Sequence, residues 1–192
     1  MKNLNICIDI DGTIIEAYYW LDVINKHFNK NVTVDQITEY QIHKVMGIGR
    51  AEYERFYKKN KFKIHSNQQL REDVKKVIKE LSILNNIYFV TARDESLTML
   101  TYSYLKKNDL YYDEVFLLGN HYKVEKAKEL NCNIFIEDNY DNAIQLSEAG
   151  FKVLLMDTNY NRKKLTENII RVYSWKEIYV IINELLLHNK AV

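Results

Sequence analysis

With 192 residues, a formal net charge of +1 at pH 7 and 28% charged residues, the chain has the composition of an ordinary soluble globular protein. The near-neutral charge argues against a nucleic-acid partner, no apolar stretch approaches the roughly 20 residues of a membrane span, and the two cysteines supply no disulfide framework. We therefore expect a cytoplasmic protein with neither a membrane nor a nucleic acid as partner, whose oligomeric state the composition leaves open.

Short apolar segments alternate with amphipathic helical segments along the chain. The first, residues 4–10, is apolar at nearly every position, which is typical of a strand covered on both faces. The following residues show helical patterns at 18–30, 34–45 and 50–60, without a convincing buried strand among them. We predict that residues 17–67 are a small helical insert directly after the first strand.

The alternation resumes after the insert and continues to a closing helix at residues 175–188. Strands that alternate with helices favour an α/β fold with a doubly wound, Rossmann-like parallel sheet, here built from residues 1–16 and 68–192. Ligands of such sheets bind at the carboxyl ends of the strands, so an insert that leaves from this end would cover the site. The later strands are expected at residues 87–91, 114–118, 133–136 and 152–156.

The strongest motif, Asp9-Ile10-Asp11-Gly12-Thr13, ends the first predicted strand. The period of two in a strand points Asp9 and Asp11 to the same side. Two carboxylates on one side of a buried strand repel each other unless a cation or a proton neutralises their charge. An Asp-Gly turn alone would end the strand, so the paired acids indicate function.

Further polar residues follow the later strands. Thr91 and Ala92 stand at the end of the second strand, Lys123 follows the third, and Glu137-Asp138 ends the fourth. Each feature alone is weak, because threonines commonly end strands and lysines are abundant. Together they place acids, a hydroxyl and an ammonium group around one rim of the sheet.

This set of groups suits phosphoryl transfer. A carboxylate nucleophile can split the reaction into two steps through an acyl phosphate, while a second carboxylate donates and accepts protons. Magnesium prefers oxygen ligands, which Asp9, Asp138 and the carbonyl of Asp11 would supply. Thr91 and the next backbone N–H group, that of Ala92, would hold the phosphate.

The order Asp-x-Asp-Gly-Thr, Thr, Lys, Glu-Asp resembles the haloacid dehalogenase (HAD) superfamily, and the likeness extends over the whole chain. The resemblance implies a Mg²⁺-dependent phosphomonoester hydrolase with a C1-type helical cap. It makes Asp9 the nucleophile, Asp11 the general acid/base, Thr91 a phosphate ligand, Lys123 the group that stabilises phosphate charge, and Asp138 a metal ligand.

Two assignments within this resemblance stay open at finer detail. Lys126 competes with Lys123, although the fourteen-residue distance from Lys123 to Glu137 looks more usual. Glu137 is expected just outside the metal's ligands. Asp141 or Asn142 would complete that outer sphere, and the motif does not choose between them.

Asp11, the second aspartate of the motif, favours phosphate esters over carbon–halide substrates, because a halide leaves without protonation and needs no acid at this position. An Asp-x-Asp phosphatase with a short cap most resembles the 5′(3′)-deoxyribonucleotidases and their bacterial nucleotidase-like relatives. A small-molecule phosphomonoester, and first of all a (deoxy)nucleoside monophosphate, is therefore the expected substrate. The alternatives are a phosphatase of sugar or other small metabolite phosphates and, from another class, a non-catalytic phosphate- or partner-binding module.

Aromatic residues of the insert are candidates for substrate selection. Their rings could stack on a nucleobase, yet aromatic residues at helical spacing are also the usual core of a small domain. The candidates are Tyr18, Tyr19, Trp20 and Tyr40.

Overall fold

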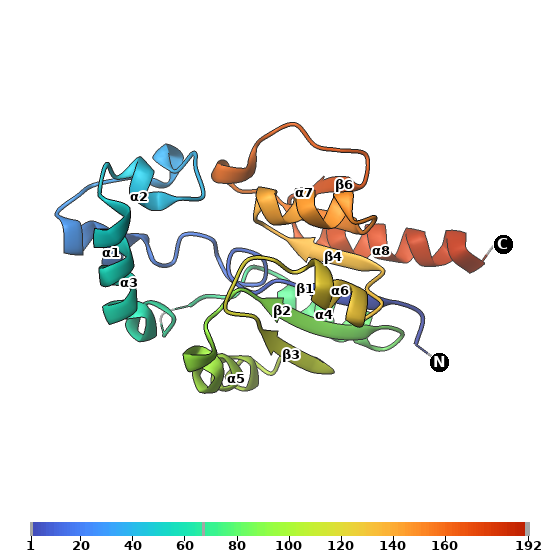
Figure 1. The fold of residues 1–192 in the computed structure, drawn as a ribbon. Helices are drawn as coiled ribbons and strands as arrows, with labels where there is room; N and C mark the ends of the chain where they lie inside the picture. The colour runs from blue at the N-terminus through green and yellow to red at the C-terminus, as the bar shows by residue number, and fades with distance from the viewer. Residues whose placement is uncertain (1, 67, 191–192) are drawn as a thin grey trace.

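The computed structural model describes residues 2–66 and 68–190, within which six strands form one sheet (Figure 1). The order is β3-β2-β1-β4-β5-β6, and every neighbouring pair is parallel. The expected doubly wound α/β fold is confirmed. The strands are β1 (Asn5–Ile8), β2 (Asn86–Thr91), β3 (Glu114–Leu117), β4 (Ile134–Glu137), β5 (Lys152–Met156) and β6 (Ile169–Val172).

Helices cover both faces of the sheet because both faces are apolar. Along β1, Ile6 and Ile8 face one hydrophobic cluster while Cys7 faces the other, as the period of two requires. The first cluster lies under α4 (Val74–Ser82), α5 (Thr98–Lys107) and α8 (Trp175–Lys190), and the second under α6 (Val124–Glu129) and α7 (Tyr140–Glu148).

The strand order reverses direction between β1 and β4. Ile8 pairs with Ile136, and the backbone N–H of Asp9 donates to the Ile136 carbonyl at 2.9 Å. The residues that follow these two strands are therefore neighbours. Where the strand order reverses in an open parallel sheet, a crevice forms outside the carboxyl ends of the strands.

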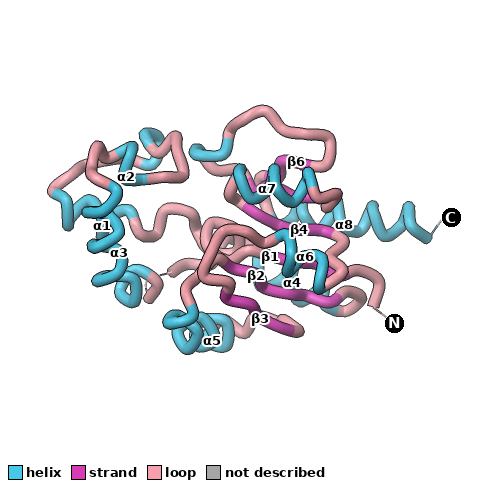
Figure 2. Tube along the Cα trace, viewed as in Figure 1, coloured by secondary structure: helices cyan, strands magenta, loops and turns pink. Residues whose placement is uncertain are grey.

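Three helices after β1 lie together, away from the sheet (left in Figure 1). They share a hydrophobic cluster that includes Leu21, Phe56 and Ile64, and Tyr160 from beyond the insert also belongs to it. Long loops join them to the sheet (Figure 2). They are α1 (Leu21–Phe28), α2 (Ile42–Val45) and α3 (Arg50–Ile64), with a 3₁₀ turn at Val34–Gln36. The predicted end of the insert, residue 67, lies outside the described residues.

The helix expected over residues 34–45 was wrong as one element. A 3₁₀ turn closes at Gln36, whose side-chain carbonyl accepts the Thr33 N–H at 2.9 Å, and helix resumes only at Ile42. Ile37 and Ile42 are both buried, and five residues of continuous helix would turn them about 140° apart. The break in the helix lets both side chains reach the same cluster.

The strand β6 was not expected from the sequence. It has only four residues, one of them Arg171, and it forms an edge of the sheet, so its apolar signal is short. The strand β1 also ends at Ile8 rather than at residue 10. Among the described residues, none of the helices has the length and apolarity needed to cross a membrane. Short 3₁₀ turns also occur at Glu95–Leu97 and Asn159–Asn161.

Candidate active site

The carboxyl ends of β1 and β4 bring three buried carboxylates to one lysine. Asp9 follows β1, Glu137 ends β4, and Asp138 is the next residue. The ammonium group of Lys123, only 1% exposed, contacts Asp9 and donates to Glu137 Oε2 at 2.7 Å. Ligand oxygens of Asp9, Glu137 and Asp138 lie within 4.8 Å of one another.

The charge of this cluster is not balanced by its own groups. Burial, together with Glu137 and Asp11, raises the pKa of Asp9 to about 7 even though Lys123 opposes the shift. Burial and the two neighbouring carboxylates hold the pKa of Asp138 well above its usual range. Three buried acids against one ammonium group are a donor set that a divalent cation fits, because oxygen ligands with excess negative charge suit Mg²⁺.

Glu137 is held at both carboxylate oxygens. Its Oε1 accepts the backbone N–H groups of Asp138 at 3.2 Å and Asn139 at 3.0 Å, where α7 begins. Its Oε2 accepts from Lys123. Glu137 thus accepts from three donors and fixes the position of Lys123. Asp138 accepts from Tyr160 at Oδ2 and, at 3.5 Å, from Thr13 at Oδ1. Asp9 accepts from Lys123 alone among the described residues, so Asp9 and Asp138 are the less occupied candidates for metal ligands.

Asp138 lies against the loop that follows β1. Gly12 has φ +87°, and a Cβ atom there would come within 2.2 Å of Asp138 Oδ2. The phenol of Tyr160 donates to the same oxygen. The close approach of the backbone to a carboxylate explains why glycine occupies this position.

Thr91 ends β2 beside the cluster and is buried, and its hydroxyl accepts the backbone N–H of Arg93 at 3.2 Å. Ala92 lines the same cavity as Asp9 and Lys123. The alternative lysine, Lys126, instead points along its own helix to Glu129, at 2.5 Å. The structure thus brings Lys123, and not Lys126, against the proposed nucleophile.

Asp11 is held by a different partner from the other acids. The guanidinium of Arg93 donates from Nε to Asp11 Oδ2 and from Nη2 to Asp11 Oδ1, both at 2.7 Å. Tyr19 donates from its hydroxyl to Oδ1 at 2.9 Å. Although burial opposes ionisation, Arg93 holds the pKa of Asp11 well below its usual range.

A cavity of about 740 Å³ joins this cluster to the helical insert. Trp20 and Tyr40 line it, and Tyr19 reaches through it to Asp11. Tyr18 is not among the described residues that line it. Instead, the Tyr18 hydroxyl accepts the Asn159 N–H at 2.9 Å, and its ring meets Tyr160 edge-on.

The two candidates for the outer metal sphere differ in exposure. Asn142 is buried in the first turns of α7, and its backbone N–H donates to Asn139 Oδ1 at 3.0 Å. Asp141 is exposed and lies 4.0 Å from Lys163. Both line the cavity, and nothing in their contacts assigns a role to either.

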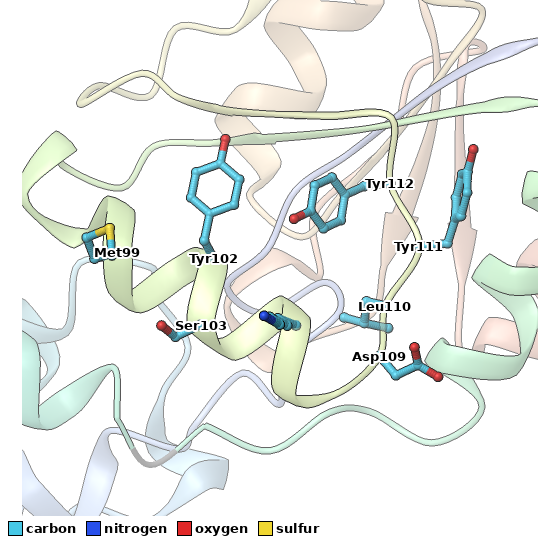
Figure 3. A pocket seen from close by; sticks show the side chains of 8 residues that line it. Met99, Tyr102, Ser103, Asp109, Leu110, Tyr111 and Tyr112 are labelled. Atoms are coloured by element: carbon cyan, nitrogen blue, oxygen red, sulfur yellow. The ribbon is translucent and has the colours of Figure 1, made fainter.

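A second hollow, of about 650 Å³, lies between α5 and the segment that leads into β3 (Figure 3). Its lining includes Met99, Tyr102 and Tyr111, and none of the residues predicted for the site. It has one lysine and one aspartate but no cluster of acids, so the chemistry belongs to the first cavity.

Sequence reasoning missed several residues that contact the acids. Tyr160 follows β5, and the rule that drew attention to the other strand ends would have found it there. Arg93 lies two residues after Thr91, and it pairs with Asp11. His65 carried no signal, because its partners Tyr19 and Tyr57 lie 46 and 8 residues before it, at no spacing that a motif would reveal.

The chain is similar to known proteins over nearly its whole length. Residues 2–191 match the model of the family described as 5′ nucleotidase, deoxy (pyrimidine), cytosolic type C protein. A nucleotidase of Clostridium acetobutylicum is 57% identical over 192 residues, covering 100% of both chains.

Solved structures share the fold at low identity. A haloacid dehalogenase-like hydrolase of Streptococcus pneumoniae superposes with a TM-score of 0.72 at 15% identity, covering 93% of this chain and 98% of that one. A Bacillus subtilis protein provisionally named a HAD hydrolase, and bound to magnesium, gives 0.65 at 17% identity, covering 95% and 100%.

Proposed function

The chain belongs to the family of cytosolic type C deoxy (pyrimidine) 5′ nucleotidases and is a nucleotidase of the haloacid dehalogenase superfamily, and we propose that it hydrolyses (deoxy)nucleoside monophosphates through an aspartyl-phosphate on Asp9. The family description includes the word cytosolic, and a cytoplasmic location is part of the proposal.

One observation carries the mechanism: Lys123 is buried between Asp9 and Glu137, while Asp138 and Thr91 face the same cavity. An ammonium group held by two acids is a fixed positive charge beside the nucleophile. Fixed charges aimed at the phosphoryl oxygens stabilise a transition state without reorganisation. The same arrangement would serve no purpose in a surface that only packs against a partner.

The first step forms the covalent intermediate. A carboxylate oxygen of Asp9 attacks phosphorus, the ester P–O bond breaks, and the leaving oxygen takes a proton from Asp11, which must be in its protonated form for this step. Thr91 and the Ala92 N–H hold the phosphoryl oxygens, and Lys123 neutralises part of their charge. The second step reverses the proton transfer: water attacks phosphorus, gives its proton to Asp11, and the bond to Asp9 breaks with release of phosphate.

The acid cluster fits a resident Mg²⁺ ion, which Asp9, Asp138 and the carbonyl of Asp11 would hold. The ion would neutralise phosphoryl charge. Tyr160 and Gly12 define the space around Asp138, because the phenol contacts Oδ2 and the glycine admits the carboxylate. Asp141 and Asn142 remain candidates for the outer sphere of this metal.

Residues 17–67 act as the cap in this proposal, and the rings of Trp20 and Tyr40 select the substrate. Both line the cavity that contains Asp9, so a nucleobase attached to the reacting phosphate would meet them. Stacking of a base on an aromatic side chain contributes about 1–3 kcal/mol. The hydroxyl of Tyr18 instead accepts from Asn159, and that of Tyr19 donates to Asp11.

The test is phosphate release, with Mg²⁺, from a panel of nucleoside monophosphates, sugar phosphates and small metabolite phosphates. We expect nucleoside monophosphates to exceed the others by at least about tenfold in kcat/KM, which corresponds to about 1.4 kcal/mol of transition-state preference. Asp9→Asn serves as the blank, because it keeps the shape of the side chain and removes the nucleophile.

The controls separate the parts of the proposal. Near-normal turnover by Asp9→Asn would rule out the covalent mechanism. A preference for sugar phosphates would keep the catalytic roles and replace the nucleotide by a sugar phosphate. Turnover of no phosphomonoester at all would favour a phosphate-binding module instead.

A further inference from the structure

The carboxylate of Asp11 accepts three hydrogen bonds from side chains. Two come from Arg93 and one from Tyr19, at 2.7 to 2.9 Å. Arg93 is itself only 3% exposed, and its remaining Nη1 donates to Thr101 on α5 at 3.0 Å. Neither the guanidinium fork nor the carboxylate can rotate without breaking one of these bonds.

This arrangement leaves one acceptor position on Asp11. Each carboxylate oxygen has two lone-pair sites. Oδ1 accepts from both Arg93 and Tyr19, whereas Oδ2 accepts only from Arg93 Nε. The Asp11 side chain is still 30% exposed, so a water molecule can approach the free site on Oδ2.

Tyr19 is fixed in its turn by the end of the insert. Its oxygen lies 2.9 Å from His65 Nδ1, and His65 Nε2 lies 2.9 Å from the Tyr57 hydroxyl on α3. The amide nitrogen of Gln68 also lies 2.9 Å from His65 Nδ1. Contacts through His65 therefore hold the Tyr19 hydroxyl beside Asp11.

We propose that Arg93 and Tyr19 are positioning residues for the second half of the reaction, which fix Asp11 so that Oδ2 is the oxygen that takes the proton of the attacking water. This inference rests on the proposed aspartyl-phosphate mechanism. The water oxygen bonds to phosphorus, its proton passes to Oδ2, and the P–O bond to Asp9 breaks with its electron pair returning to the Asp9 carboxylate.

The proposal separates the two steps for a substrate with a good leaving group. p-Nitrophenolate leaves without protonation, so formation of the phosphoenzyme does not need an oriented Asp11. Hydrolysis of the phosphoenzyme always needs a base. Loss of the hydrogen bonds that hold Asp11 should therefore slow hydrolysis of the phosphoenzyme and leave the rate of its formation nearly unchanged.

The experiment is rapid mixing of the full chain with p-nitrophenyl phosphate and Mg²⁺, following p-nitrophenolate. In Arg93→Lys, which keeps the charge and loses the fork, we expect the ratio of burst rate to steady-state rate to rise about tenfold, a fraction of what general-base catalysis contributes. Acid-quenched samples should show more protein carrying one phosphoryl group, measured by intact mass. Tyr19→Phe should move the same ratio in the same direction by about threefold, because it removes one of three donors.

Tyr104→Phe is the matched control on α5, one turn from Thr101. The Tyr104 hydroxyl is buried without a hydrogen-bond partner among the described residues, so its removal should leave the burst ratio unchanged. If Arg93→Lys lowers both rates by one factor, the side chain is merely structural and the inference is overturned. If Arg93→Lys does not fold, Tyr19→Phe decides alone by the same ratio.

The same measurements distinguish a failure of the proposed function from a failure of the positioning role. In the first case no phosphorylated protein accumulates in the wild type or in any variant, and Asp9→Asn keeps its turnover. An unchanged burst ratio in Arg93→Lys with phosphoenzyme present contradicts only the positioning role.

Discussion

The rim of the sheet and the helical insert hold their polar groups in different ways. At the rim, Asp9, Lys123 and Glu137 are almost fully buried and bonded to one another. In the insert, Trp20 is half-buried and Tyr40 is 46% exposed, and both face an open cavity. The rim is built for one fixed charge pattern, whereas the insert offers rings with room for a ligand beside them.

In the proposed function, this contrast separates the residues of catalysis from those of substrate selection. A change at the rim should affect every phosphomonoester alike, because every substrate presents the same phosphoryl group. A change among the cavity-lining rings of the insert should affect substrates according to what is attached to the phosphate. If variants of the rim and of the insert affected the substrates in the same way, the two regions would not differ in function.

The largest effect is expected for Lys123→Met, which keeps the length of the side chain and removes its charge. We expect kcat to fall by about 10³-fold for nucleotides and for p-nitrophenyl phosphate alike, the upper range for loss of one oxyanion donor. Two carboxylates also lose their buried partner, which should lower the free energy of unfolding by about 3 kcal/mol. Steady-state rates and thermal unfolding measure both effects.

Lys126→Met is the matched control for this change. Its ammonium group pairs with Glu129 on the surface of α6, so neither the rates nor the stability should move appreciably. Equal losses in the two lysine variants would show that the position of Lys123 between the acids has no special value.

A smaller effect is expected from a pair of glycines, one in each region. Gly12→Ala would place a Cβ atom 2.2 Å from Asp138 Oδ2, whereas Gly47→Ala meets nothing within 4 Å. Both have positive φ, so the backbone conformation alone should cost each variant about 1 kcal/mol of stability, and the contact with Asp138 adds to this loss in Gly12→Ala. Only Gly12→Ala should also lose activity, by about 100-fold, because a displacement of about 1 Å in a catalytic group costs that much.

The two glycine variants are compared by kcat/KM and by denaturant unfolding. If Gly47→Ala loses as much activity as Gly12→Ala, backbone strain in either region is enough to explain the loss. The close approach at Asp138 would then not be specific to the site.

Magnesium should stabilise the rim without help from the insert. At about 100 times its Kd the ion should add about 2.7 kcal/mol to the free energy of unfolding, seen as a rise in Tm on titration with MgCl₂. Asp138→Asn should abolish this rise, and Trp20→Ala should keep it. A chelator should remove turnover, and full activity in its presence would rule out the metal site.

The same contrast explains how much the sequence could predict. The grouping of Asp9, Lys123 and Asp138 could be predicted because parallel strands bring their carboxyl ends to one edge of the sheet, so a motif at a strand end has a known place. The partners of Asp11 depend on side chains that cross between segments, such as Tyr19 with His65, and no local pattern encodes them.

Within the insert, periodicity predicted that helices exist but not where they break. Residues 34–45 became a turn and a short helix because Ile37 and Ile42 must both reach the small core. Tyr18 and Trp20 were equal candidates in the sequence, yet only Trp20 lines the cavity. Which side of a short segment faces a cavity depends on the packing of neighbours that lie far along the chain.

The smallest and most selective effect is expected for Trp20→Ala. We expect kcat/KM for a nucleoside monophosphate to fall by about tenfold, within the range for loss of one stacked ring, while that for ribose 5-phosphate changes little. Tyr111→Ala, an exposed aromatic residue of the second hollow, is the control and should alter neither substrate. Equal losses for the two substrates would place Trp20 in the hydrophobic core of the insert alone, and substrate selection would then have to come from the rim.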